Sequence, residues 1–564
     1  MAIIGIDLGT TNSLAAVWKD GRPVLIPNTL GTYLTPSVVY VDTEKNVWTG
    51  AAAKEKRYLD PHQGAASFKR SMGTNQRYRL FHQTFTPQEL SALILKQLKA
   101  DAEAFLDEPV EEAVISVPAY FNDEQRYATR EAGALAGLRV ERLVNEPSAA
   151  ALACRMETGE ENCEFLVIDF GGGTLDVSVV ECFEQIIEIQ AVAGDNHLGG
   201  DDFDRRIAEH FCEQHNLVFD MLSEHMQTRL LKQCEQCKRA LTTEPAAMLE
   251  YQVQGETLGL ILTPALLIEI CAPLLVRIEQ AARKALSDAR KDISDIDQIV
   301  LVGGSCKMPV VRRFLTQALG KEPFLAGQPD EIVALGAGIY AGIKERKSDI
   351  RDVLLTDICP FTLGIAIVNH DDSSNPLMSP LIERNSTLPV SRSGVYYTAG
   401  EQQTKIKVEI FQGESRYCHN NLRLGSLEID VPPAPVGRES VVVRFAYDIN
   451  GILQVDVQNR YSQKVETTII KEQIRLSPEE LEARMQELSA LKCPPREQAE
   501  NLLLMSRGER LYEETLGEDR ELVNQLLNRF SHVLRTGGPA SIAAAQKTMA
   551  ERLDWIEQKL TSPL

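Results

Sequence analysis

The sequence has little of what marks a membrane-bound, exported or nucleic-acid-binding chain. Its nearest approach to a long apolar run, Leu260 to Val276, is broken by Glu269 and two prolines, which argues against a transmembrane helix. Basic residues are outnumbered: 59 Lys and Arg against 80 Asp and Glu leave a formal charge of -21. Such an acidic balance disfavours nucleic-acid and anionic-membrane partners. The first residues have no basic segment ahead of an apolar one, so we expect no export signal.

A disulfide framework is also not expected. The 11 cysteines are odd in number and dispersed from Cys154 to Cys493, which is typical of reduced thiols in a cytosolic chain. Cys234 and Cys237 have metal-like spacing, but no second pair or His cluster lies near them in the sequence. We therefore favour ordinary helix cysteines over a zinc or redox site at this position.

The length and the residue patterns indicate several domains. At roughly 150 residues per domain, 564 residues predict three or four. Up to about residue 350, short apolar strands alternate with helical stretches, which is typical of an α/β architecture. From Cys359 to about Lys471 the apolar period becomes two, with alternating runs on both sides of an Asn450-Gly451 turn signal. The remaining residues show helical spacing, so the order is α/β, then antiparallel β, then helical.

An internal repeat carries the first functional signal. The segment from Ile4 to Thr11 is echoed by the segment from Val167 to Thr174, 162 residues later. Each copy places a carboxylate at a strand end, then glycine-rich backbone, then a hydroxyl, a combination that suits phosphate oxygens and a bridging cation. A single copy would be an ordinary turn, but duplication at lobe spacing favours two phosphate-binding hairpins facing one cleft.

Two weaker elements fit a nucleotide. Leu301 to Ser305 ends a predicted strand with two glycines and leads through Pro309 into a helix. The spacing of Glu235, Lys238, Arg239 and Thr242 puts these side chains on one helix face. Taken alone, the segment from Leu301 to Ser305 would be a common strand-to-helix turn. The helix face would likewise be an ordinary solvated charged face.

Together these segments resemble the DnaK-type heat-shock chaperones. The resemblance covers at least residues 1 to 475, and the short lid and loops are most similar to the specialised HscC-like branch. It rests on five motifs in the family's order: Asp7-Leu8-Gly9-Thr10-Thr11-Asn12-Ser13, Val117-Pro118-Ala119-Tyr120-Phe121-Asn122, Asn145-Glu146-Pro147-Ser148-Ala149-Ala150, Asp169-Phe170-Gly171-Gly172-Gly173-Thr174 and Leu198-Gly199-Gly200-Asp201-Asp202-Phe203-Asp204.

The resemblance implies a multidomain chaperone that hydrolyses ATP. Its expected parts are a duplicated, two-lobed actin-like α/β ATPase domain (1–350), a linker (351–358), a β-sandwich peptide-binding domain (359–475) and an α-helical lid (476–564). ATP hydrolysis to ADP would close the peptide clamp on extended apolar segments of unfolded or specific clients, and nucleotide exchange would reopen it. A small-molecule kinase or filament-forming ATPase with the same lobes is the alternative, but neither would need the β domain and helices. We expect a monomer in a bacterial cytoplasm.

Site residues follow from the resemblance motif by motif. Asp7 and Asp169 would hold hydrated Mg²⁺, and a potassium ion is also expected. The implied catalytic residues are Lys69, Glu146, Thr174 and Asp176. The implied ATP and ADP contacts are Gly9, Thr10, Thr11, Asn12, Gly171, Gly172, Gly173, Gly199, Gly200, Glu235, Lys238, Arg239, Thr242, Gly303, Gly304, Ser305, Lys307 and Asp330.

The sequence departs from the family pattern around the nucleotide. Lys307 stands where the family usually has an arginine stacked on adenine, and a lysine cannot reproduce that planar contact. The segments from Met72 to Thr86 and from Tyr251 to Thr263 are also shortened. These departures predict rapid ADP release with little need for an exchange factor.

Two further surfaces are implied. Arg142, Asn145 and Asp357 match the family's docking surface for a J-domain cochaperone. Apolar alternation in the β domain by itself favours plain core packing, but seven residues align with the family's peptide channel: Ile365, Val368, Ile382, Tyr396, Ala399, Ile406 and Val408. Val368 and Ala399 would form an arch over the peptide.

Overall fold

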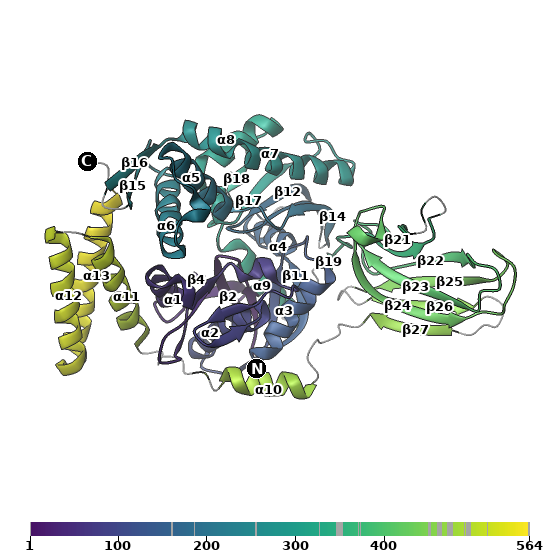
Figure 1. Cartoon of the computed structure of the whole chain (residues 1–564), viewed down its shortest axis with the longest axis horizontal. Coiled ribbons are helices and arrows are strands. Elements are labelled where there is room, and N and C mark those ends of the chain that lie inside the picture. The colour runs from purple at the N-terminus through teal and green to yellow at the C-terminus, as the bar shows by residue number, and fades with distance from the viewer. Residues whose placement is uncertain are drawn as a thin grey trace.

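The computed structural model describes residues 2–158, 162–184, 186–253, 256–325, 327–345, 354–369, 372, 374–448, 453–459, 465–470, 478–489, 491, 498–515 and 517–561. The expected Asn450-Gly451 turn and the first linker residues, 351–353, lie outside them. Figure 1 shows two central lobes with a β-sandwich at one end and a helical bundle at the other.

Each lobe is built on a sheet that carries one copy of the repeat. Lobe I has the order β11-β10-β1-β2-β3, and lobe II has the order β18-β17-β12-β13-β14-β19. In both, the strand bearing the motif pairs in parallel on one side and through an antiparallel hairpin on the other. The bounds are β1 (Ala2–Asp7), β2 (Asn12–Lys19), β3 (Arg22–Ile26), β10 (Val110–Val117), β11 (Arg139–Asn145), β12 (Cys163–Phe170), β13 (Leu175–Phe183), β14 (Ile186–Asp195), β17 (Gln298–Val302), β18 (Phe324–Leu325) and β19 (Leu354–Thr356).

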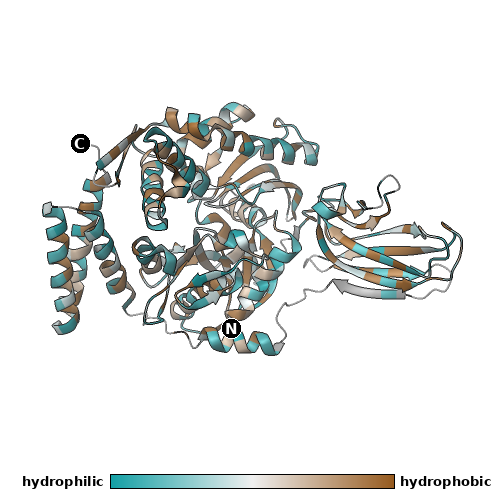
Figure 2. Ribbon diagram, viewed as in Figure 1, coloured by the Kyte–Doolittle hydropathy of each residue, from teal (hydrophilic) through white to brown (hydrophobic). Residues whose placement is uncertain are grey.

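Helices cover these sheets, and α4 (Glu146–Thr158) packs against α9 (Ile332–Lys344) in the layer between them. Figure 2 shows the central strands of both lobes as mainly hydrophobic. The other helices of the lobes are α1 (Gly50–Leu59), α2 (Pro87–Leu106), α3 (Asp123–Leu135), α5 (Gly200–Gln214), α6 (Glu224–Ala240), α7 (Pro264–Ala289) and α8 (Pro309–Leu319). Small strands complete them: β4 (Thr35–Pro36), β5 (Val38–Val41), β6 (Val47–Thr49), β7 (Gly64–Ala66), β8 (Tyr78–Leu80), β9 (Gln83–Phe85), β15 (Ala247–Val253) and β16 (Glu256–Leu262).

The period-two segment forms two packed antiparallel sheets. Val441, Val443 and Phe445 are fully buried in their shared core, which confirms the alternation as one-sided burial. One sheet holds β21 (Leu377–Ile382), β20 (Leu363–Ile367), β23 (Lys405–Gln412) and β24 (Leu422–Asp430). The other holds β22 (Val390–Tyr397), β25 (Ser440–Tyr447), β26 (Leu453–Asn459) and β27 (Val465–Ile470).

The linker joins lobe II as a strand. β19 pairs in parallel with β14, so that Leu354 to Thr356 lie against Ile186 to Glu188. This contact is a main-chain strand pairing. The described part of the linker is therefore docked on lobe II.

The C-terminal helices also lie on the lobes and do not cover the sandwich. α10 (Pro478–Ser489) lies beneath the lobes in Figure 1. It places Leu488 in the core of lobe I and packs Leu481 and Met485 against that core. Helices α11 (Ala499–Glu514), α12 (Gly517–Thr536) and α13 (Pro539–Thr561) form a bundle with its own core, at the opposite end from the sandwich. No helix in the described part of the chain combines the length and apolar content needed to cross a membrane.

Candidate functional site

A cavity of about 600 Å³ lies between the two lobes. Both hairpins of the repeat reach it, as do the helix face on α6 and the third glycine element after β17. Most of the implied site residues line it: Asp7, Gly9, Thr10, Thr11, Asn12, Lys69, Glu146, Asp169, Gly171, Gly172, Thr174, Gly200, Glu235, Lys238, Arg239, Thr242, Gly304, Ser305, Lys307 and Asp330. Gly173, Asp176, Gly199 and Gly303 are not part of the lining.

The two hairpin loops approach each other so closely that side chains are excluded at one point. A Cβ atom on Gly172 would lie 1.8 Å from the Thr11 hydroxyl of the other lobe. The hydroxyls of Thr10 and Thr11 are buried, and neither has a hydrogen-bond partner among the described residues. Buried hydroxyls are costly without partners. Phosphate oxygens in the cavity would supply them.

Two carboxylates occupy equivalent strand ends. Asp7 accepts a hydrogen bond of 2.8 Å from the Ser116 hydroxyl. Burial, and then repulsion from Glu146, raises the pKa of Asp7 to about 7, and the same causes raise the pKa of Asp169 well above its usual value. Repulsion from Asp7 also contributes to the raised pKa of Asp169, so a cation held by both carboxylates would be favoured. No group of three or more His, Cys, Asp or Glu in the described residues could hold a metal alone. Because Mg²⁺ prefers oxygen ligands and keeps several waters, a pair of carboxylates fits a hydrated Mg²⁺ shared with phosphates.

Lys69 and Glu146 form a buried ion pair at the floor of the cavity. The Lys69 Nζ lies 2.7 Å from Glu146 Oε1, and both side chains are almost inaccessible. Burial alone would lower the pKa of Lys69, but attraction from Glu146 and Asp7 outweighs it and raises that pKa. The lysine therefore stays charged, as stabilisation of a terminal phosphate requires.

Asp176 lies behind the cavity wall, on β13 opposite Asp169. One carboxylate oxygen accepts the Tyr120 main-chain N–H at 3.1 Å, and the other is buried with no hydrogen-bond partner among the described residues. Burial, followed by repulsion from Glu146, raises the pKa of Asp176 to about 7. This second oxygen is available to accept a hydrogen bond from water. The role of Asp176 in orienting the attacking water stays a prediction.

Short polar contacts join α5, α6 and the third glycine element in the part of the cavity wall formed by lobe II. Lys238 donates to the Gly200 carbonyl and to the Asp204 carboxylate, both at 2.8 Å. Ser305 donates to the Gly171 carbonyl at 2.7 Å, which ties the third glycine element to a phosphate hairpin. Lys307 forms an ion pair with Asp330, so its ammonium group is already engaged.

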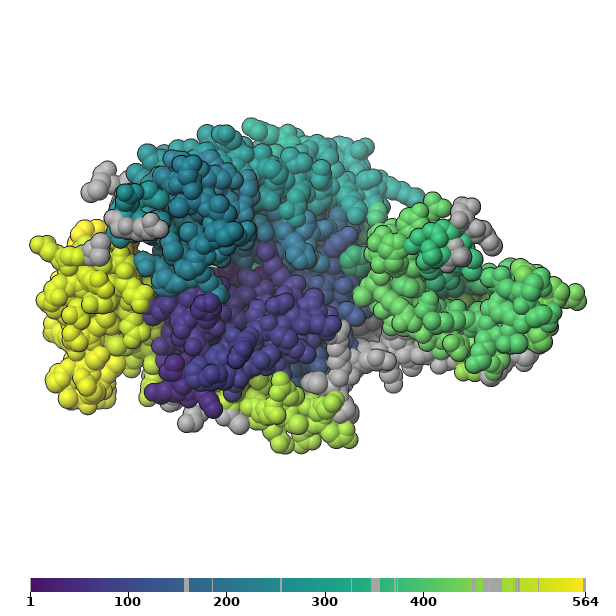
Figure 3. Space-filling view, in the orientation of Figure 1, coloured from purple at the N-terminus to yellow at the C-terminus, as the bar shows by residue number. Residues whose placement is uncertain are grey.

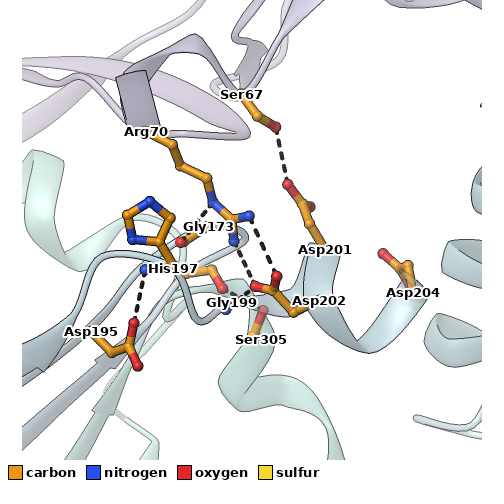
Figure 4. A network of polar contacts seen from close by, with 12 residues as sticks. Ser67, Arg70, Gly173, Asp195, His197, Gly199, Asp201, Asp202, Asp204 and Ser305 are labelled. Atoms are coloured by element: carbon orange, nitrogen blue, oxygen red, sulfur yellow. Dashed lines mark hydrogen bonds and ion pairs between the residues drawn. The ribbon is translucent and has the colours of Figure 1, made fainter. Parts of the chain in front are cut away.

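Sequence reasoning missed a network that joins the lobes beside the hairpins (Figure 4). Arg70 of lobe I donates to the Gly173 carbonyl at 2.8 Å and to the Asp202 carboxylate at 2.6 Å, both in lobe II. Asp202 also accepts the Gly199 N–H at 2.7 Å, at the start of α5. Ser67 donates to Asp201 at 3.0 Å. The only sign of this network in the sequence was the position of Arg70 next to Lys69.

The implied peptide residues divide into two groups. Ile365, Ile382, Ile406 and Val408 are buried in the core of the sandwich. Val368 is 48% exposed and Ala399 is also exposed, while Tyr396 is half-buried with its hydroxyl 3.2 Å from that of Ser379. The structure therefore leaves the arch residues accessible.

The implied cochaperone residues converge at the linker. Asn145 donates to the Asp357 carboxylate at 2.5 Å, and the Arg142 guanidinium lies 5.0 Å from the centre of the Tyr340 ring. Burial raises the pKa of Asp357, against attraction from Arg126 and Arg142.

Cys234 and Cys237 lie on α6 with both side chains buried. Burial raises the pKa of Cys237 to about 12 and that of Cys234 well above its usual value. The reactive thiolate form is therefore disfavoured at both positions.

A family model described as Hsp70 protein matches residues 3–83 and 75–560 of the chain. The match extends over both lobes, the β-sandwich and most of the C-terminal helices.

Proposed function

The chain belongs to the Hsp70 family, and from this membership we propose that it is an ATP-driven peptide clamp of the HscC-like branch. Hsp70 proteins are ATP-dependent chaperones with an actin-like ATPase domain and a substrate-binding domain. In the proposed cycle, ATP favours docked domains with an open peptide site. Hydrolysis to ADP then closes the clamp. We place the ATPase domain at 1–350, the linker at 351–358, the clamp at 359–475 and the lid at 476–564.

One observation carries the proposal. The buried hydroxyls of Thr10 and Thr11 have no hydrogen-bond partner among the described residues, and these threonines line the same cavity as the charged Lys69, between the duplicated hairpins. When bound, Mg²⁺ held by Asp7 and Asp169 would neutralise phosphate charge. The hairpin amides and hydroxyls hold the phosphates in place, and Lys69 balances the charge that develops on the terminal group. Positioning and charge balance are the main requirements for phosphoryl transfer to water.

The contacts around Lys307 support rapid ADP release. Its ammonium group is paired with Asp330, so it is not free to cover an adenine ring. We propose that ADP leaves quickly once the domains separate, with little need for an exchange factor. A potassium ion near the phosphates and a J-domain cochaperone at Arg142, Asn145 and Asp357 complete the proposed cycle in a bacterial cytoplasm.

Steady-state ATP turnover of Thr174→Ala, with Thr174→Ser as its matched control, tests the assignment. Removal of the hydroxyl should reduce turnover at least about a hundredfold with unchanged thermal unfolding, whereas serine restores it. Lys69→Ala should behave like the alanine variant. Wild-type turnover in either alanine variant would refute the assigned roles.

The class of reaction needs its own assay. Stimulation of ATP hydrolysis by an extended apolar peptide supports the clamp. ATP-dependent sedimentation or phosphorylation of a sugar without peptide stimulation would favour the filament protein or the kinase.

A further inference from the structure

The helical bundle α11–α13 touches both lobes at once. Figure 3 shows it, in yellow, lying against the purple surface of lobe I and the teal surface of lobe II. α11 packs along α1 of lobe I, while α13 reaches β15 of lobe II. The bundle therefore spans the gap between the lobes on the side away from the sandwich.

A buried chain of charges runs through this contact. Arg510 of α11 is 3% exposed and forms ion pairs with Glu55 of lobe I and, at 2.6 Å, with Glu514 of the bundle. Glu514 in turn lies 2.6 Å from Lys232 on α6 of lobe II. Burial alone would raise the pKa of Glu514, but Arg510 and Lys232 outweigh it and hold that pKa below its usual value. The sequence of charges Glu55, Arg510, Glu514, Lys232 therefore links lobe I to lobe II through the bundle.

Lys232, at one end of this series of charges, also lines a cavity next to the one between the lobes. A second cavity of about 240 Å³ lies between α1 and α6, and it shares Thr10, Thr11 and Glu235 with the nucleotide cavity. Its lining also includes Tyr58 and Lys232, whose ring centre and ammonium group lie 4.9 Å apart across the gap between the lobes. Separation of α1 from α6 would widen this second cavity. It would also break the series of ion pairs from Glu55 to Lys232.

We propose that the α11–α13 bundle is a built-in bracket that holds the two lobes together over bound nucleotide. Nucleotide leaves slowly while the bundle is docked and quickly after the bundle departs. This inference rests on the proposed function, because it assumes that the cavity between the lobes holds nucleotide. Any partner that opens the lobes at α1 and α6 has to displace the bundle first. Rapid ADP release then belongs to the undocked state, and retention of ATP to the docked state.

Nucleotide release from the full chain tests the bracket. The variants are Glu55→Gln, which removes the charge on lobe I and leaves the bundle's own pairs intact, and Arg510→Ala. Arg507→Ala is the matched control, because Arg507 lies on the same helix and bonds to Asp554 and Glu557 inside the bundle. Stopped-flow release of a fluorescent, slowly hydrolysed ATP analogue should be about tenfold faster in both test variants and within about twofold of wild type in the control.

A measurement without nucleotide separates this inference from the proposed function. Hydrogen exchange of the nucleotide-free protein should rise in α1 and α6 in Glu55→Gln, but not in Arg507→Ala. Exchange that is unchanged in Glu55→Gln, or release rates equal to wild type in both test variants, would overturn the bracket. Failure of the wild type to bind the analogue would instead count against the nucleotide site, and hydrogen exchange would still decide the bracket.

Discussion

Asp204, in the wall of the cavity between the lobes, has a strongly raised pKa. Its side chain is buried, 2.8 Å from the Lys238 ammonium group. Burial raises the pKa of Asp204 from 3.8 to about 7, although Lys238 acts in the opposite direction. The folded protein therefore holds this proton more tightly than the unfolded chain. Such a group stabilises the fold fully below about pH 4, and that stabilisation is lost as pH rises through about 7.

Asp204→Asn removes this titration and should make stability less dependent on pH. Between about pH 5 and about pH 8, the free energy of unfolding of the nucleotide-free variant should fall less than that of wild type, by on the order of 2 kcal/mol. Urea denaturation at a series of pH values measures the difference. Asp220→Asn, at an exposed acid that pairs with Arg205, is the control and should follow wild type. Identical pH slopes for all three proteins would contradict the role assigned to Asp204.

At the scale of elements, α4 and α9 cross where one residue has no room for a side chain. A Cβ atom on Gly336 of α9 would lie 1.9 Å from the Ala149 carbonyl oxygen of α4. Because that neighbour is main chain, it cannot rotate away as a flexible side chain would. The closeness of these helices fixes the distance between the sheets on which the two phosphate hairpins stand.

Gly336→Ala should therefore destabilise the protein although alanine favours helix. Overpacking at such a contact costs about 3 kcal/mol, and the gain in helix propensity is about 1 kcal/mol, so a net loss of about 2 kcal/mol is expected. Gly259→Ala on β16 is the control, because its nearest contact would be 3.9 Å away. Chemical denaturation compares the two. Equal stability of both variants would show that the helices separate freely.

Local sequence patterns predicted the helices and strands better than they predicted which elements pack together. β25 and β26 pair as the period of two in the β domain predicted, and the repeat at Asp7 and Asp169 forms the expected hairpins. Both predictions rest on patterns that act over a few residues. Leu481 and Met485 predicted an apolar helix face, but nothing in their spacing shows that it packs on lobe I. Alternation likewise could not separate core residues of the sandwich from exposed Val368.

Contacts between distant charges escaped prediction altogether. Arg70 meets Asp202 across 132 residues, and Arg510 meets Glu55 across 455. A charged side chain carries no local signal for a partner so far along the chain, since the pairing is decided by how whole lobes and helices pack. The motifs predicted most of the residues that line the cavity between the lobes, but they did not predict the residues that hold its two walls together.

At the scale of the whole molecule, the sandwich is docked on the lobes by a few polar contacts. Tyr447 of β25 donates its hydroxyl to the Asp123 carboxylate at the start of α3, at 2.7 Å. Arg384 donates to Asp288 of α7 at 2.7 Å. Since β19 pairs with β14 in the same conformation, the docked linker and the docked sandwich occur together. In the proposed cycle, these contacts would be the means by which nucleotide and peptide influence each other's affinity.

Tyr447→Phe should weaken this coupling and leave both binding sites intact. Phenylalanine keeps the packing of a ring that is 2% exposed but leaves Asp123, whose pKa burial already raises, without its hydroxyl donor. A hydrogen bond to a charged group is worth about 2 kcal/mol, so the ratio of peptide Kd values with ATP and with ADP should fall about tenfold or more. Fluorescence anisotropy with an extended apolar peptide measures both values.

Tyr397→Phe, at a residue 57% exposed on β22, should keep the wild-type ratio. An unchanged ratio in Tyr447→Phe would mean that the hydroxyl does not couple the sandwich to the lobes.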